Sequence, residues 1–354
     1  MNSSTTSSPS SPSSSSSPSI FPPIPAPLQR LFDLVPLVTY PANALPGDNS
    51  SDDGFKALPD TDTDHLDHLD HLSTLYVFID PADAVRGRAS FNPTCLKWQT
   101  FLRIADIPFR TVASSNHASP TGALPFLQPA RNRATTAAPI ATTTARPLPP
   151  RPIPASDLST WVAKTVTSPS TPPSTLRDHP RAAAYQALLD TSLRRAWLHA
   201  VYLDEPRDRQ SNKGASIAVR LYAHTASTSF LVRAALASQL RAAAAAEVWG
   251  SQQHNMSRGT PAATAQIYRD AETALSALAT VLGGDNYFFG SAEPTLFDAA
   301  VFSYTHLLLE DGDDNDEASR FPWHNRILPN MVRGHPQLVQ HRSRIVENYW
   351  TKEA

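Results

Sequence analysis

The chain has 354 residues, a formal net charge of −2, 33 prolines, 12 glycines and one cysteine. The near-neutral charge gives no electrostatic case for binding nucleic acid or an anionic membrane surface. A single cysteine excludes an internal disulfide framework, a CxxC redox pair and a cysteine-rich zinc site. The length allows one large or two ordinary domains, but the proline excess predicts that a good part of it is not globular.

Residues 1–73 are predicted to form a Ser/Pro-rich and acidic extension. Its first 19 residues are a Ser/Pro tract that has too little apolar surface to offset the entropy of ordering. The segment 20–46 is more apolar, so it either lies against the chain's own globular part or docks onto a partner. Its candidate docking residues are Leu28, Leu31 and Phe32.

Two polar stretches invite a metal-site interpretation. An Asp-His-Leu repeat covers 64–72, but a period of three does not hold its histidines on one helical stripe, and no second ligand cluster stands out. The acidic stretch 310–317 lacks the glycine and glutamate that an EF-hand calcium loop requires. We therefore expect no bound metal.

Residues 75–128 carry most of the information. The apolar run 75–79 predicts a strand buried on both faces. Asn92 followed by Pro93 predicts the start of a helix, because asparagine caps free amides and proline suits the first helical position. The predicted buried face of this helix contains Cys95, Trp98, Phe101 and Leu102.

Three further strands are predicted at 109–112, 123–127 and 151–155. Strand, helix and strand in this order imply two parallel strands joined by a right-handed crossover. We therefore predict a thioredoxin-like domain over 74–165, with a low-complexity insertion at 129–150, where a hairpin connection can lengthen at small cost.

The region 175–354 is predicted to be all helical. A buried face runs from Tyr185 to Val201, and an Ala-rich helix follows from 217 to 249. Capping signals then give helix boundaries, and prolines predict a broken last helix. These signals are Thr260-Pro261, Gly283, Thr295-x-x-Asp298, Pro329 and Pro336.

This two-domain order is the architecture of glutathione transferases, which need a thiol or hydroxyl after the first strand. Cys95 is the best candidate, because the first turn of a helix lowers the pKa of a thiol. It also lies on an apolar stripe, where an isolated cysteine is usually a small core residue. Ser90 is a weaker candidate, and Ser156-Asp157 is interpreted as the N-cap of the next helix.

The loop 114–120 lies where a thioredoxin-like domain presents its ligand groove. Asn116 and His117 in this loop either bind a partner or satisfy local backbone groups. Neither residue completes a catalytic constellation.

The runs 95–102, 107–110 and 114–127 resemble the metaxin family, most closely its fungal peripheral members in the mitochondrial sorting and assembly machinery. In the helical region, 185–204 and 288–299 are similar to the family's first long helix and later capping motif. The resemblance covers roughly 75–350 apart from the insertions, and a transferase-like fold is what it implies.

The resemblance implies a non-enzymatic protein without cofactor on the cytosolic face of the mitochondrial outer membrane. Its partners would be a β-barrel core subunit, a second metaxin-like subunit and β-barrel precursors, recognised by their C-terminal β-signal. The absence of a membrane-spanning segment favours the peripheral subunit over the anchored one. The resemblance also implies a cis peptide bond before Pro125.

The candidate binding residues for a partner or precursor are Asn116, His117, Ser119, Leu124, Pro125, Leu28, Leu31 and Phe32. Two other functions stay open at this point. One is a glutathione-dependent transferase or thiol enzyme that uses Cys95, and the other is a transferase-like assembly scaffold.

Overall fold

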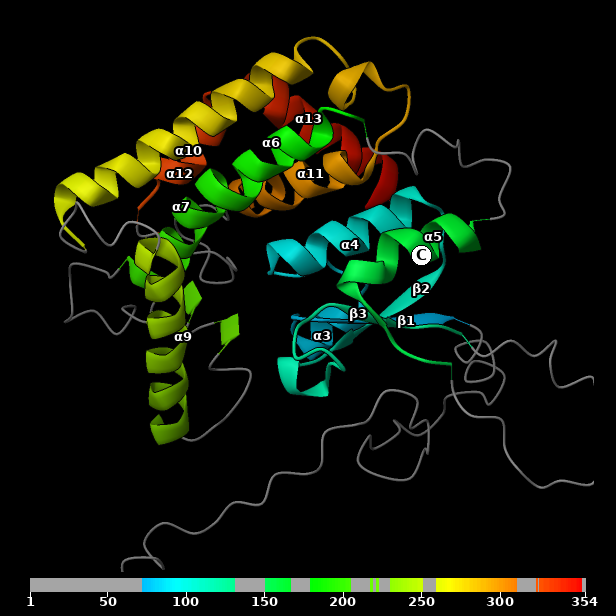
Figure 1. Cartoon of the computed structure of the whole chain (residues 1–354). Coiled ribbons are helices and arrows are strands. Elements are labelled where there is room, and N and C mark those ends of the chain that lie inside the picture. The colour runs from blue at the N-terminus through cyan, green and yellow to red at the C-terminus, as the bar shows by residue number, and fades with distance from the viewer. Residues whose placement is uncertain are drawn as a thin grey trace, which may run out of the picture. The chain divides into compact units, whose positions relative to one another are not determined.

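A computed structural model describes residues 72–130, 150–166, 179–204, 217–218, 221–222, 230–250, 259–310, 323 and 325–351 (Figure 1). The extension before residue 72, with its docking segment and Asp-His-Leu repeat, lies outside the described residues. So do most of the insertion, the predicted domain linker and the acidic stretch after Glu310.

The first half of the structure, residues 72–166, is built on a four-stranded sheet with the order β2-β1-β3-β4. The second, helical half comprises the described residues from 179 to 351. The central strand β1 (Ser73–Val77) lies parallel to β2 (Phe109–Ala113) and antiparallel to β3 (Phe126–Gln128). The last strand, β4 (Ile153–Pro154), pairs antiparallel with β3. The predicted thioredoxin-like topology is confirmed, including the parallel crossover and the late hairpin.

The predicted bounds of the first and third strands are wrong, and the last strand is shorter than the predicted 151–155. The first strand begins and ends two residues before the predicted run 75–79, because its pairing with β2 starts at Ser73. The third begins at Phe126 instead of Ala123, after a cis Leu124–Pro125 bond and a proline that has no N–H to donate. The expected cis bond is confirmed.

Helix α4 (Pro93–Ile104) follows the predicted start signal. The Asn92 side chain accepts a hydrogen bond from the backbone N–H of Cys95 at 3.2 Å, and Pro93 takes the first helical position. The predicted face is buried, as are Leu96, Gln99 and Thr100 on other sides. A short helix, α3 (Pro81–Val85), precedes α4 and was not predicted, although Asp80 and Pro81 form the same cap-and-proline signal.

The connection into helix α5 (Leu158–Thr165) corrects one prediction. A short turn, η3 (Ala155–Asp157), leads into α5, and Asp157 takes the N-cap position. Its side chain makes no capping hydrogen bond; instead, Ser156 Oγ lies 3.1 Å from Asp157 Oδ1 as a donor. The two residues mark the helix start without capping it.

The first long helix of the second half is continuous but not uniformly α-helical. Two π-helical segments, η4 (Leu189–Leu193) and η5 (His199–Leu203), alternate with α6 (Ala182–Leu188) and α7 (Arg194–Leu198). Each π turn rotates the following residues relative to a regular helix. The buried surface is therefore broader than the predicted stripe, and Trp197, Leu198 and His199 are buried as well.

The later helices follow their capping signals. The Thr260 side chain accepts a hydrogen bond from Ala263 N, and Gly283 ends the helix with a φ of 55° that favours glycine. A break precedes Pro336, whereas Pro329 fits inside a first helical turn. The helices are α9 (Phe230–Gly250), α10 (Pro261–Leu282), α11 (Leu296–Leu309), α12 (Ile327–Arg333) and α13 (Pro336–Tyr349). Among the described helices, none is long and apolar enough to cross a bilayer.

Helices α4 and α11 pack against each other and join the two halves. Ala299 of α11 is fully buried in the core that the sheet forms with one face of α4. Phe91 and Leu96, from the first half, belong in turn to the core of the helical half. Each core is therefore completed by side chains from the other half.

This packing predicts that Ala299→Leu lowers the free energy of unfolding by about 1–3 kcal/mol, because the larger side chain must push α4 and α11 apart. Urea denaturation measures the change. A matched control is Ala235→Leu on the exposed face of α9, which should change stability by less than about 0.5 kcal/mol. A neutral Ala299→Leu would contradict close packing between the halves.

Candidate functional site

The amino end of α4 is the place where a transferase would need its reactive group. Here the Cys95 thiol is fully buried and contacts the backbone of Phe78 and the side chain of Ser90. Burial raises the pKa of this thiol to about 12, and its two hydrogen bonds oppose the shift only in part. Cys95 is therefore a neutral thiol at physiological pH.

Ser90, the weaker candidate, is also committed to the structure. Its hydroxyl donates to the carbonyl of Phe78 at 2.5 Å and accepts from the backbone N–H of Asn92 at 3.1 Å. Its own N–H donates to the side chain of Gln99 at 2.8 Å. With its hydroxyl buried and occupied, Ser90 ties the end of β1 to the start of α4.

Tyr222, from the second half, closes this end of α4. The Asn92 amide donates to the Tyr222 hydroxyl at 3.0 Å, so one side chain caps the helix and also binds the other half. The Tyr222 ring packs edge-on against Phe78 and Phe91, with centroids 5.2 and 5.1 Å away. Burial raises the pKa of Tyr222, so its hydroxyl stays protonated. No sequence pattern indicated this residue.

The polar loop at the sheet edge is held by its own side chains. Asn116 accepts a hydrogen bond from the backbone N–H of Leu124 at 3.0 Å. Ser119 Oγ donates to the carbonyl of Ala123 at 2.6 Å. Asn116 and Ser119 therefore satisfy local backbone groups, one of the two predicted roles, while His117 is exposed in the turn η1 (Asn116–Ala118).

These residues form one continuous loop that leads to the buried Leu124 and Pro125. Because the Leu124 N–H is already bonded to Asn116, it is not free to bind a peptide. The other predicted docking residues, Leu28, Leu31 and Phe32, lie outside the described residues.

Two domain families match the chain. Residues 93–206 match the glutathione S-transferase N-terminal domain, and residues 271–345 match the glutathione S-transferase C-terminal domain. The first match begins at α4, leaves out β1 and runs through the first long helix of the second half, and the second match runs from within α10 to within α13. The chain has a glutathione-transferase-like fold. No curated protein matches it.

Several solved structures are similar to this transferase-like chain. A glutathione S-transferase of Ceriporiopsis subvermispora in complex with glutathione is 12% identical, has a TM-score of 0.44 and covers 80% of this chain and 100% of its own. Glutaredoxin 2 of Salmonella typhimurium, in complex with glutathione, is 13% identical, has a TM-score of 0.43 and covers 80% of this chain and 97% of its own.

A surface depression of about 570 Å³ lies along α10 of the transferase-like fold. Two of its hydroxyls, those of Thr273 and Thr280, donate to backbone carbonyls one turn earlier. Glu272, its only carboxylate, pairs with His335 at 3.2 Å. Three of its polar side chains are therefore already engaged within the chain, which leaves few groups to fix a small ligand. In the described part of the chain, no His, Cys, Asp and Glu cluster could hold a metal ion.

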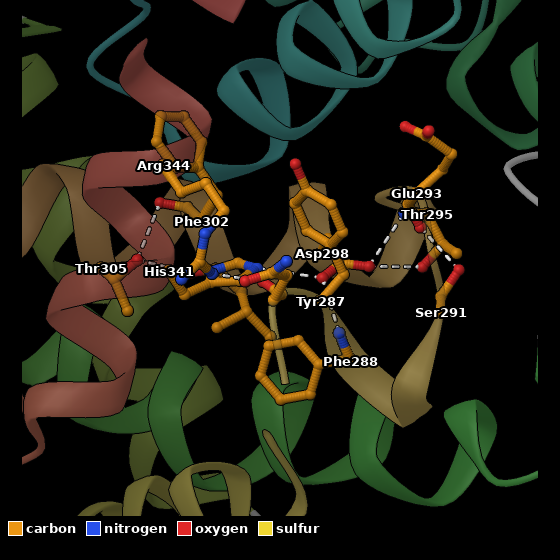
Figure 2. A network of polar contacts seen from close by, with 12 residues as sticks. Tyr287, Phe288, Ser291, Glu293, Thr295, Asp298, Phe302, Thr305, His341 and Arg344 are labelled. Atoms are coloured by element: carbon orange, nitrogen blue, oxygen red, sulfur yellow. Dashed lines mark hydrogen bonds and ion pairs between the residues drawn. The ribbon is translucent and has the colours of Figure 1, made fainter. Parts of the chain in front are cut away.

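A buried polar network at the start of α11 includes the predicted capping box (Figure 2). Asp298 Oδ2 accepts from the backbone N–H and the hydroxyl of Thr295, each at 2.8 Å. Asp298 Oδ1 lies 2.9 Å from both the backbone N of Phe288 and Nε2 of His341. Asp298 and His341 are fully buried, so this pair cannot reach a substrate and instead fastens α11 to α13 and to the turn η7 (Phe288–Gly290).

The Cys95 environment predicts very slow alkylation. At pH 8 the folded chain should react with iodoacetamide about a thousandfold more slowly than the urea-unfolded chain, because few thiols are ionised at a pKa of about 12. Mass spectrometry follows the reaction, which has one possible cysteine target. Tyr222→Ala should accelerate it, whereas Tyr222→Phe, which keeps the ring, should not. Fast labelling of the folded wild-type chain would contradict this account.

The Asp298 network predicts that Asp298→Ala lowers the free energy of unfolding by about 3–5 kcal/mol, because it leaves several buried donors unpaired. The double variant Asp298→Ala/His341→Leu should lose less than the sum of the two single changes. Thermal and urea denaturation measure both. Thr273→Ala, which removes an exposed helix hydroxyl, is the control and should change stability by less than about 0.5 kcal/mol. Strict additivity would show that the pair is not coupled.

Proposed function

We propose that this transferase-like chain is a non-enzymatic, peripheral subunit of the mitochondrial sorting and assembly machinery. It acts on the cytosolic face of the outer membrane, beside a β-barrel core subunit and a second metaxin-like subunit. There it recognises β-barrel precursors by their C-terminal β-signal and helps their insertion. It uses no cofactor.

The observation that carries the non-enzymatic part is the closed amino end of α4. A glutathione-activating site needs an accessible thiol or hydroxyl beside free backbone amides. Here Cys95 is fully buried, and the Asn92 side chain occupies an amide of the first turn. Tyr222 packs over the same end of the helix. The fold is therefore suited to serve through its surfaces.

The mitochondrial part of the proposal rests on the sequence motifs that resemble the metaxins. These motifs fall on the buried helix α4, on the edge strand β2 and on the loop that ends at β3. The later motif falls on η7 and the start of α11, where Asp298 is buried. The motifs cover both buried and exposed positions, so they do not by themselves identify the surface that would contact a partner.

Fractionation and copurification test the proposal. The chain should sediment with isolated mitochondria and be released by carbonate or high salt, because it would be held by protein contacts alone. An affinity tag on its carboxyl end should recover the β-barrel core subunit. A chain present only in the soluble cytosol, without the core subunit, would overturn the proposal.

Deleting residues 20–46 separates the two expectations for that segment. Loss of the core subunit with an unchanged unfolding temperature would identify the segment as a partner-docking element. Retention of the core subunit with a lower unfolding temperature would show that it packs on its own chain.

An activity assay separates the proposed function from the competing thiol enzyme. If the proposal is correct, purified protein should conjugate glutathione to 1-chloro-2,4-dinitrobenzene no faster than buffer. Measurable turnover that Cys95→Ala abolishes would overturn the non-enzymatic assignment. Tyr222→Phe serves as a control for contaminating transferase, because it leaves Cys95 buried.

A further inference from the structure

The strand β2 forms one edge of the sheet, and its outer side makes no strand pairing in the described part of the chain. Ser114 N donates to Val77 O at 3.0 Å, so the peptide groups of even-numbered residues here point toward β1. In a parallel strand, the backbone N–H and C=O groups of successive residues point alternately toward one neighbouring strand and toward the other side. The N–H and C=O groups of Phe109, Thr111 and Ala113 therefore point outward.

The opposite edge of the sheet cannot offer an equivalent row. Its strand β4 has two residues, and both Pro152 and Pro154 lack an N–H group. Proline at an edge strand blocks further strand pairing. Of the two described edges, only β2 can accept another strand over several residues.

The surroundings of the β2 edge suit a particular strand. Helix α3 contacts β2 and is separated by three residues from the end of β1 at Val77, whose pairing partner is Ala113. It therefore lies near the Ala113 end of the edge. Val85 on α3 is 82% exposed, which makes it the most exposed large apolar side chain among the described residues. Arg86 beside it is exposed and makes no ion pair with a described residue.

We propose that the edge of β2 is the receptor surface for the C-terminal β-signal strand of a precursor. The strand adds in parallel to β2 and hydrogen-bonds the outward peptide groups of Phe109, Thr111 and Ala113. One of its apolar side chains packs on Val85, and its terminal carboxylate pairs with Arg86.

The chemistry of this edge matches the features that such strands share. Main-chain hydrogen bonding recognises an extended backbone and tolerates different side chains. A neighbouring apolar contact favours a strand with alternating apolar side chains. A carboxylate at the end of the added strand is complementary in charge to Arg86. The inference rests on the proposed function, since it names the surface that this function would use.

Amide hydrogen exchange on the wild-type chain tests the proposal directly. The probe is a synthetic peptide of about 11 residues with the sequence of the last strand of an outer-membrane β-barrel protein. Saturating peptide should slow exchange at Phe109, Thr111 and Ala113 by at least about tenfold. Arg110 and Val112 should change little, because their N–H groups already face β1.

Matched variants test the same surface by affinity. Thr111→Pro removes one outward N–H without removing a bond to β1 and should weaken peptide binding about tenfold or more. Thr111→Val removes the hydroxyl, keeps the N–H and should bind within about twofold of wild type. Arg86→Gln should weaken the free-acid peptide but not its C-terminal amide. Circular dichroism checks that each variant is folded.

Several outcomes would overturn the β2 assignment. Slower amide exchange confined to other elements, or equal peptide binding by folded Thr111→Pro and Thr111→Val, would show that β2 is not the binding surface. Either result would leave the proposed function intact. No peptide binding by a chain that still copurifies with the β-barrel core subunit would do the same. If Thr111→Pro does not fold, the exchange pattern of the wild-type chain decides.

Discussion

The packing of α4 between the sheet and the helical half is the constraint on which the rest of the structure depends. This helix contributes Cys95, Trp98 and Phe101 to one core and Leu96 to the other, while α11 returns Ala299 to the first. A helix that is buried on several sides keeps few groups for a ligand. The same contact that holds the two halves together therefore removes the helix end from solvent.

The state of Cys95 follows from a competition of two effects at that end. The helix dipole stabilises a thiolate by typically 0.3–1 kcal/mol near a surface, about 2 at most. A pKa raised from 9 to about 12 corresponds to roughly 4 kcal/mol in the opposite direction, so desolvation wins. Asn92 and Tyr222 also close this helix end to a ligand. Asn92 accepts a hydrogen bond from the backbone N–H of Cys95, and its amide donates to the Tyr222 hydroxyl. A transferase-like fold can thus keep its architecture without an ionised thiol.

Sequence patterns predicted the features that depend on neighbouring residues. Asn92-Pro93, Thr260-Pro261 and Thr295-x-x-Asp298 gave correct helix starts, because a cap and its amides are only a few residues apart. The run 75–79 predicted a strand two residues too late in the chain. Apolar residues indicate which positions are buried, but the ends of the strand are set by its pairing with β2. Tyr222 could not be found, since it meets Asn92 across 130 positions of sequence. The outward-facing peptide groups of β2 could not be predicted either, because they follow from the register between β1 and β2, which the sequence of one strand does not contain.

The two π-helical segments, η4 and η5, have a consequence for comparing this chain with its relatives. A π turn accommodates one extra residue in a helix without changing where the helix begins and ends in space. Relatives that lack either turn would match Leu189–Leu203 only with a single-residue gap inside a helix, where alignments usually avoid gaps. An ungapped comparison would then pair Trp197 and His199 with residues on the wrong helical face. A sequence comparison along this helix therefore has to allow a gap at each π turn before its side chains are compared.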